Sequence, residues 1–218
     1  MEDRTTLNIP VIALRGLTVF PDLTLSFDVE REISIYALDS AMESDRMAFL
    51  VTQREIATMA PTEEDLYTVG TICRILQIIK TSETSVRVLV EGKQRARLHR
   101  LWQTRPFLQA NVELLEEDFP GRMTARTEAL IRQTYVLFGE YKDLVSNLND
   151  EFVSAVLDCR DPGQLADFIT QNINLRHTDR QRILEELHPV KRLRIMNDIL
   201  AHEVEVISLE VDLEHKVR

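Results

Sequence analysis

The chain has 218 residues, 44% of them hydrophobic and 28% charged, a composition that can fill a large core and differs from that of a disordered protein. Its 36 acidic residues outnumber its 26 Lys and Arg residues, and the formal net charge of -10 argues against nucleic acid as the main partner, because phosphate binding depends on positive charge. The 2 cysteines, Cys73 and Cys159, are too few for a disulfide framework or a thiolate metal cluster, so we expect both to be buried, reduced thiols.

The start of the chain shows no targeting signal. MEDRTTLN lacks the basic region and apolar core of a signal peptide, and it lacks the Arg-rich character of a transit peptide. No apolar run approaches the ~18 residues that a membrane span needs. We therefore expect a cytoplasmic protein without a membrane partner.

Up to about residue 118 the apolar residues recur mainly at every second position, which is typical of strands with one buried face. Seven runs rich in Val, Ile, Leu and Phe have this character: IPVIALR, TLSFDV, MAFLVTQ, VGTICRILQIIKT, SVRVLVEG, RARLHRLW and FLQANVELLEE. So many strands predict a closed or nearly closed sheet within residues 1–118. Ser82 to Ser85 provide small polar residues for a hairpin between the fourth and fifth runs.

One segment interrupts this pattern. In ISIYALDSAMES, the residues Ile35, Leu38, Ala41 and Met42 are spaced as on one face of a helix. The sequence therefore predicts one short helix between the second and third strands.

From about residue 121 the apolar period becomes that of a helix. MTARTEALIRQTYVLFGEYKDLVSNL predicts an amphipathic helix over 123–148. Asp161 followed by Pro162 predicts the start of a second helix, since Asp is a favoured N-cap and Pro suits the first helical position. Thr178 with Gln181 three residues later predicts a capping box at the start of a third.

Pro189 can begin the longest helix, in which six apolar residues form one stripe. They are Val190, Leu193, Leu200, Val204, Ile207 and Val211. Packing inside a helical bundle is the favoured interpretation of this stripe, and pairing of subunits is the alternative. The residues 119–218 therefore predict a helical unit that leads into a long helix. Because no Gly, Asn or Pro ends this helix, we expect the chain to be part of a longer protein.

The sequence carries incomplete versions of two catalytic or binding motifs. His202 and Glu203 resemble the start of a zinc-protease helix, but Val206 stands where the second His is required. Gly92 and Lys93 resemble the end of a phosphate loop, but neither the preceding Gly nor the following Ser or Thr is present. A catalytic triad is assembled in space, so a Ser or Cys nucleophile stays open. We expect no enzyme in this chain, with no catalytic, metal-binding or cofactor-binding residue.

A basic stretch stands out in this acidic chain. Between Glu91 and Glu113 there is no acidic residue, while basic residues are frequent. They are Lys93, Arg95, Arg97, Arg100 and Arg105. The favoured interpretation is a solvated strand face, because the basic residues alternate with apolar ones. The alternative is a nucleic-acid-binding module over 93–105 that uses Lys93, Arg95, Arg97 and Arg100.

Several stretches together resemble the amino-terminal, substrate-binding domain of ATP-dependent Lon proteases. They are IPVIALRGLTVFPDLTLSFDV, RMAFLVTQRE, EEDLYTVGTICRILQIIKTSETSVRVLVEGKQRARL, DPGQLADFIT and LHPVKRLRIMNDILAHEVEVISLEVDLEHKVR. The resemblance implies an α+β fold, an N-terminal pseudo-β-barrel with one helix followed by an α-helical bundle that ends in a long helix. It also implies capture of unfolded or damaged proteins and assembly of a homohexamer. ATP, Mg and the Ser-Lys peptidase would then belong to other parts of the parent protein.

A receptor for unfolded chains needs apolar side chains that face water on a rigid scaffold. Leu89 is one candidate, since it stands between Arg87 and Glu91 on the polar side of an alternating strand; a strand buried on both faces is the alternative. The loop beside Gly16 holds the other candidates, for which packing in the core is the favoured interpretation and substrate binding the alternative. They are Leu14, Val19, Phe20 and Pro21.

Overall fold

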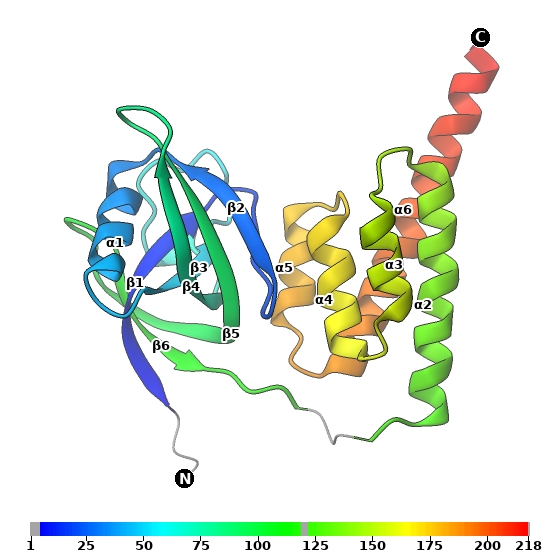
Figure 1. Ribbon diagram of the computed structural model, residues 1–218, viewed down its shortest axis with the longest axis horizontal. Coiled ribbons are helices and arrows are strands. Elements are labelled where there is room, and N and C mark those ends of the chain that lie inside the picture. The colour runs from blue at the N-terminus through cyan, green and yellow to red at the C-terminus, as the bar shows by residue number, and fades with distance from the viewer. Residues whose placement is uncertain (1–4, 119–121, 218) are drawn as a thin grey trace. The chain divides into compact units, whose positions relative to one another are not determined.

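The computed structural model describes residues 5–118 and 122–217 (Figure 1). The chain divides into two compact units, residues 1–116 with 176–185 and residues 117–175 with 186–218. This division differs from a single boundary near residue 118, because the segment 176–185 belongs to the first unit. The fold is α+β, as the sequence predicts.

The first unit is built on one six-stranded sheet. Its strands are β1 (Thr6–Leu14), β2 (Thr24–Val29), β3 (Met47–Thr52), β4 (Val69–Lys80), β5 (Val86–Gln103) and β6 (Gln109–Leu114). They follow the order β2-β5-β4-β3-β1-β6, and β6 also pairs with β5, so the sheet closes on itself. β1 and β3 are parallel, and the other pairs are antiparallel.

Closure depends on the length of β5. The first half of β5 pairs with β2 and the second half pairs with β6, while β4 runs along its other edge. The fifth and sixth predicted runs are therefore one strand. Gly92 lies between them without ending it, and a Cβ atom at this position would lie 2.1 Å from the backbone oxygen of Phe20. Gly is needed at this position because another segment of backbone crosses there.

The hairpin between β4 and β5 is confirmed. The backbone N–H of Thr81 donates to the carbonyl of Ser85 at 3.0 Å, and the two strands pair from Lys80 and Val86 onwards. Small polar residues occupy the turn, where the chain reverses without a buried side chain.

The core of this unit has two clusters, with β1 between them. Ile12 and Leu14 pack in one cluster with Leu38 of the helix α1 (Glu32–Met42), which confirms the predicted short helix. Val11 and Ala13 pack in the other cluster, on the opposite side of the strand. β1 is thus buried on both faces along its second half, where alternation of polar and apolar residues is absent.

The helix α5 (His177–Glu185) belongs to the same unit. Gln181 is buried, and its Nε2 donates to the carbonyl of Val69 at 2.9 Å and to Glu185 Oε1 at 3.0 Å. The predicted capping box is wrong, because the Gln181 side chain binds β4 instead of the helix start. The helix begins at His177, and the backbone carbonyl of Arg176 accepts from the first turn.

The second unit consists of α2 (Ala125–Leu144), α3 (Asp150–Asp158), α4 (Pro162–Asn172) and α6 (Pro189–Val217). Asp161 caps α4 by accepting from the backbone N–H of Gln164 at 2.8 Å, with Pro162 at the first helical position, as predicted. α2 ends at Leu144, before the predicted 148, because Val145 adopts an extended conformation. α6 begins at Pro189, as predicted.

A buried cation holds the start of α6. The Arg192 side chain is 1% exposed, its Nη2 donates to Glu117 Oε1 at 2.5 Å, and its Nε lies 3.0 Å from Asp167 Oδ1. Its Nη1 donates to the carbonyl of Glu186 at 2.9 Å. The guanidinium is thereby paired with carboxylates on both sides, as a buried charge requires. A Cβ atom at Gly163 would lie 2.6 Å from Arg192 Nη2, so this position has no room for a side chain.

Candidate functional site

The barrel unit has two hollows of interest, each lined by one of the candidates from the sequence. The β1–β2 pocket has a volume of about 160 Å³ and includes Leu14. The outer-face groove has a volume of about 100 Å³ and includes Leu89. Both are small, and both are formed mainly by strand residues.

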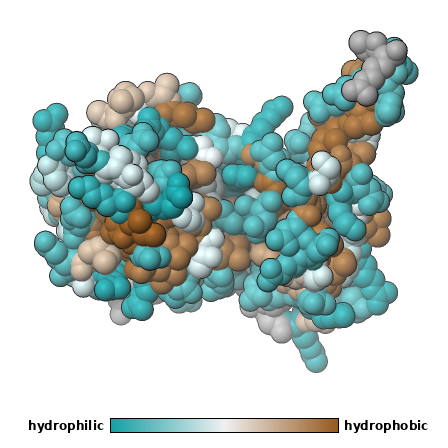
Figure 2. All heavy atoms as spheres, turned by 45° about the horizontal axis from the view of Figure 1, so that its top comes forward, coloured by the Kyte–Doolittle hydropathy of each residue, from teal (hydrophilic) through white to brown (hydrophobic). Residues whose placement is uncertain are grey.

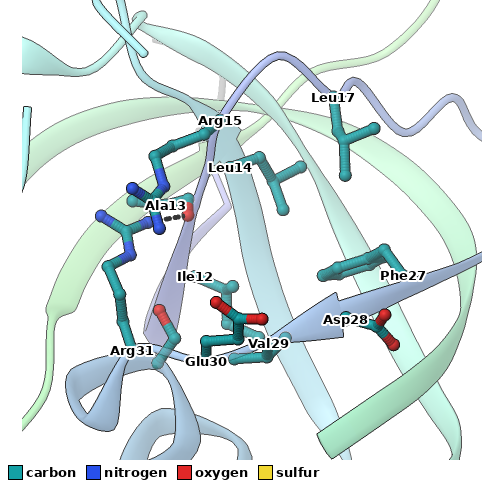
Figure 3. Close-up of a pocket in the computed structure, with 11 residues that line it drawn as sticks. Ile12, Ala13, Leu14, Arg15, Leu17, Phe27, Asp28, Val29, Glu30 and Arg31 are labelled. Carbon is teal, nitrogen blue, oxygen red and sulfur yellow. Dashed lines mark hydrogen bonds between the residues drawn. The ribbon is translucent and has the colours of Figure 1, made fainter. Parts of the chain in front are cut away.

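The β1–β2 pocket lies between two strands that do not pair with each other (Figure 3). It is lined by Ile12, Ala13, Leu14, Arg15, Leu17, Phe27, Asp28, Val29, Glu30, Arg31 and Ser34. β2 pairs with β5, and the second half of β1 pairs with β3. Buried apolar residues of both strands form its floor, and charged or polar side chains line the rest: Arg15, Asp28, Glu30, Arg31 and Ser34.

Two guanidinium groups stand side by side at one end of this pocket, those of Arg15 and Arg31 (Figure 3). Arg31 Nη2 donates to the carbonyl of Ala13 and Nη1 donates to Gln53 Oε1, each at 2.5 Å. Burial, and secondly the charge of Arg15, lowers the pKa of Arg31. Within residues 5–118 and 122–217 no ion pair is formed by either guanidinium. The pocket therefore joins an apolar floor to an uncompensated positive end.

The outer-face groove crosses β2, β5 and β4 on the side away from the core. It is lined by Ser26, Gln77, Ile79, Arg87 and Leu89. Val88 and Val90 are buried at 0% exposure, so Leu89 between them points outwards and is half-buried, as the alternation predicts. Ile79 is 49% exposed on the same face. This groove thus presents apolar side chains to water on a regular sheet.

An ion pair fixes one wall of the groove. Arg87 donates from Nε and Nη2 to the two carboxylate oxygens of Asp28, at 2.8 and 3.2 Å. This hydrogen bonding lowers the pKa of Asp28. The two residues are opposite each other in the β2–β5 register, so the pair spans neighbouring strands.

The remaining loop candidates lie mostly inside the barrel. Val19 and Phe20 are buried, with exposures of 2% and 0%, and Leu14 is buried at 3% although it lines the β1–β2 pocket. Pro21 is half-buried. Core packing, the favoured interpretation from the sequence, describes Val19 and Phe20, because the segment 20–23 lies against β5 at Gly92.

The basic stretch of β5 is neutralised or buried along most of its length. Arg95 is 2% exposed, and its Nε donates to the carbonyl of Leu184 in α5, so the prediction of a solvated face is wrong for this residue. Arg97 Nη1 and His99 Nε2 lie 3.9 and 2.8 Å from Glu113 Oε2. Lys93 Nζ lies 2.6 Å from Glu91 Oε2, and Arg100 is exposed. The stretch does not form one continuous cationic face.

Neither cysteine is placed as a nucleophile. Cys73 is buried among apolar residues, and burial raises the pKa of its thiol far above its usual range. Cys159 is half-buried, which corrects the prediction that both are buried, and burial raises the pKa of its thiol as well.

Among the residues that the structure describes, no group of three or more His, Cys, Asp or Glu side chains is placed to hold a metal ion. No described helix combines the length and the apolar character needed to cross a membrane.

Sequence reasoning missed Arg31 and Ile79. The signal for Ile79 was present, since the adjacent Ile78 and Ile79 of one strand must point to opposite faces. Ile78 packs against the core, which leaves Ile79 outside. Arg31 carried no signal, because its position beside Arg15 depends on how β1 and α1 come together.

Comparison with known proteins agrees with this architecture. Residues 8–202 match the family model of the ATP-dependent protease La (LON) substrate-binding domain. The Lon protease of Desulforamulus reducens is 37% identical over 211 residues, which cover 97% of this chain and 26% of that protein. Lon protease 1 of Bacillus subtilis is 34% identical over 218 residues, covering 100% and 28%. The chain therefore spans about a quarter of the length of these curated relatives.

Solved structures share the fold. The N-terminal domain of Mycobacterium avium complex Lon protease superimposes with a TM-score of 0.69 at 20% identity, covering 89% of this chain and 98% of that one. The Lon N-terminal domain protein from Xanthomonas campestris gives a TM-score of 0.61 at 15% identity, covering 86% and 95%. With the family model matched over residues 8–202, the chain belongs to the family of Lon substrate-binding domains.

Proposed function

We propose that this chain is the non-catalytic substrate-recognition domain of a cytoplasmic Lon protease. It captures unfolded or damaged polypeptides, which ATPase and peptidase modules elsewhere in the parent protein then degrade. The observation that carries the proposal is the outer-face groove, where Ile79 and Leu89 face water on a hydrogen-bonded sheet.

The groove suits an unfolded chain for a physical reason. Unfolded polypeptides differ from folded ones by their exposed apolar side chains, which gain free energy when they leave water. Leu89 lies opposite Gln77 on one neighbouring strand and opposite Ser26 on the other, so polar groups border the apolar contact. The contact is small, and this favours weak binding to many sequences over tight binding to one.

The experiment compares one protein in two states. A reduced, alkylated protein that stays unfolded should bind the chain, and its native, oxidised form should not, when each is titrated and followed by fluorescence anisotropy. The double variant Leu89→Gln, Ile79→Gln should weaken binding of the unfolded form by about thirtyfold, because each of the two lost apolar contacts is worth about 1 kcal/mol.

A matched control replaces an exposed apolar residue elsewhere. Val136 in α2 is 62% exposed, and Val136→Gln should leave the affinity unchanged. If the folded form bound as well as the unfolded one, or if both variants weakened binding equally, recognition at this groove would be wrong.

We also infer a role in assembly for the last turns of α6. Beyond Leu200 the helix exposes apolar residues, with Leu209 at 56% and Leu213 at 61%. Figure 2 shows hydrophobic residues at the surface of these turns, next to the grey end of the chain. Apolar residues left open on a helix favour packing against another helix, so removal of residues 204–218 should lower self-association in the parent protein.

A further inference from the structure

We propose that the β1–β2 pocket binds a polypeptide residue that combines an apolar side chain with a neighbouring carboxylate, the side chain entering the pocket and the carboxylate facing Arg15 and Arg31. The inference deepens the proposed function and rests on it in one respect, that the chain binds polypeptides. The pocket would prefer a carboxylate beside the apolar side chain, which an apolar surface alone does not.

The size of the pocket limits what enters. Its volume is about 160 Å³, and a cavity of about 150 Å³ with apolar walls holds a benzene ring. Apolar side chains from both strands and the loop after β1 form the floor of the pocket. They are Ile12, Leu14, Leu17, Phe27 and Val29. One aromatic or branched side chain fits, and it would cover the apolar part of the lining.

The two positive charges at the mouth of the pocket favour a carboxylate on the ligand. Arg15 and Arg31 place two guanidinium groups together, and Arg31 uses two of its five N–H donors on Ala13 and Gln53. Like charges at short range repel, and a carboxylate between them would turn that repulsion into two charge-assisted hydrogen bonds. Planar guanidinium groups recognise carboxylates in particular, because the two groups match in geometry.

The strand edges beside the pocket favour an extended peptide as the ligand. β2 is the end strand of the sheet order and pairs with β5. The second half of β1 pairs with β3, and the carbonyl of Ala13 points the other way, towards Arg31. An extended peptide is the ligand that lies between two such edges, since its backbone presents N–H and C=O groups along both sides.

The carboxylates of the pocket set a limit on affinity. Asp28 is paired with Arg87 and is therefore compensated. Glu30 is exposed, and in Figure 3 its carboxylate lies in the middle of the pocket, between the two guanidinium groups and Asp28. Replacing Glu30 with Gln should strengthen binding of an anionic peptide, which is a gain that a simple loss of structure cannot imitate.

The experiment uses three short peptides of Gly and Ser with a single Phe, titrated calorimetrically into the 218-residue chain. One ends in Phe with a free α-carboxylate, one ends in the same Phe as an amide, and one has an internal Phe-Asp pair with an amidated end. The free acid should bind about tenfold more tightly than the amide, the magnitude of a charge-assisted hydrogen bond. The Phe-Asp peptide distinguishes a terminal carboxylate from a side-chain one as the source of the charge.

Variants locate the effect. Arg15→Gln should abolish the difference between acid and amide, Glu30→Gln should enlarge it, and Arg74→Gln should preserve it. Arg74 is exposed on β4 and does not line the pocket, so it matches the charge change of Arg15→Gln. Circular dichroism of each variant confirms folding before the titration.

The carboxylate pocket and the capture of unfolded proteins would be contradicted by different results. If the wild-type chain bound acid and amide equally, or if the preference survived Arg15→Gln, the carboxylate pocket would be wrong while capture of unfolded proteins stood. If no peptide bound but the unfolded protein still did, the pocket would likewise be wrong. If neither bound, the proposed function would be overturned, and this inference with it.

Discussion

The Nε atom of Arg95 in β5 donates a hydrogen bond to the backbone carbonyl of Leu184 in α5, 89 positions later, at 2.8 Å. The guanidinium also lies 5.9 Å from the centre of the Phe20 ring. A basic residue from a stretch that looks like an ordinary solvated strand is thus one of the contacts that attach α5 to the barrel.

Replacement of Arg95 should therefore cost stability. Arg95→Met keeps much of the side-chain volume but removes the donor, and we expect the free energy of unfolding to fall by about 2 kcal/mol, the value of a hydrogen bond from a charged group. Urea denaturation measures this free energy, followed by the fluorescence of Trp102, which is the single Trp and lies in β5 like Arg95. Arg100→Met, at an exposed position of β5, should change the free energy by less than about 0.5 kcal/mol. Equal losses for both variants would contradict a structural role for Arg95.

Two glycines should respond to the same substitution in opposite directions. Gly92→Ala places a Cβ atom 2.1 Å from the backbone oxygen of Phe20, so we expect a loss of at least about 2 kcal/mol as the segment 20–23 is displaced. Gly139→Ala in α2 meets nothing within 4 Å and should stabilise by about 0.5–1 kcal/mol, because Ala is the better helix former. Thermal unfolding of both variants tests this pair. A neutral Gly92→Ala would show that the crossing at β5 is looser than the structure has it.

The short helix η1 (Glu63–Asp65) gives a prediction about pH. Thr62 donates from its backbone N–H to Asp65 Oδ2 at 2.7 Å, and this hydrogen bond lowers the pKa of Asp65 below 3.8 in the folded state. A lowered pKa adds stability above the unfolded pKa of about 3.9, and the contribution is lost as the pH falls through the folded value. Asp65→Asn should therefore be less stable than the wild type at pH 6, and the gap should shrink at pH 3. Urea midpoints of both proteins at the two pH values give this difference in stability. An equal difference at pH 6 and pH 3 would show that ionisation of Asp65 does not stabilise the fold.

The basic stretch should contribute little to capture of unfolded proteins. Lys93 is close to Glu91 and Arg100 is exposed, so the double variant Lys93→Gln, Arg100→Gln changes charge without touching the outer-face groove. Its affinity for an unfolded protein should stay within about twofold of the wild type, a change worth less than about 0.5 kcal/mol. A large loss that grows as salt is lowered would instead favour an electrostatic site, as in the nucleic-acid alternative.

Local rules explain what the sequence determined by itself. The alternation around Leu89 placed Val88 and Val90 inside and Leu89 outside, because successive side chains of any strand point to opposite faces. Asp161 and Pro162 marked the start of α4 for a similar reason, since the cap and the first turn are made by neighbouring residues. The family resemblance and the α+β class, a barrel followed by helices, were also readable from the residues alone.

Tertiary structure decided which faces stay open. The alternation assigned Arg95 to a face but could not show that α5 packs there, and it could not show that Gly92 lets a strand continue past a crossing backbone. The β1–β2 pocket depends on the packing of α1 against β1, which brings Arg31 to the carbonyl of Ala13, 18 positions earlier. Periodicity is a property of a few neighbouring residues, so the sequence alone assigned side chains to the two faces of each strand. Burial depends on segments that meet only when the chain has folded. The fold therefore determined which strand faces water and a ligand can reach.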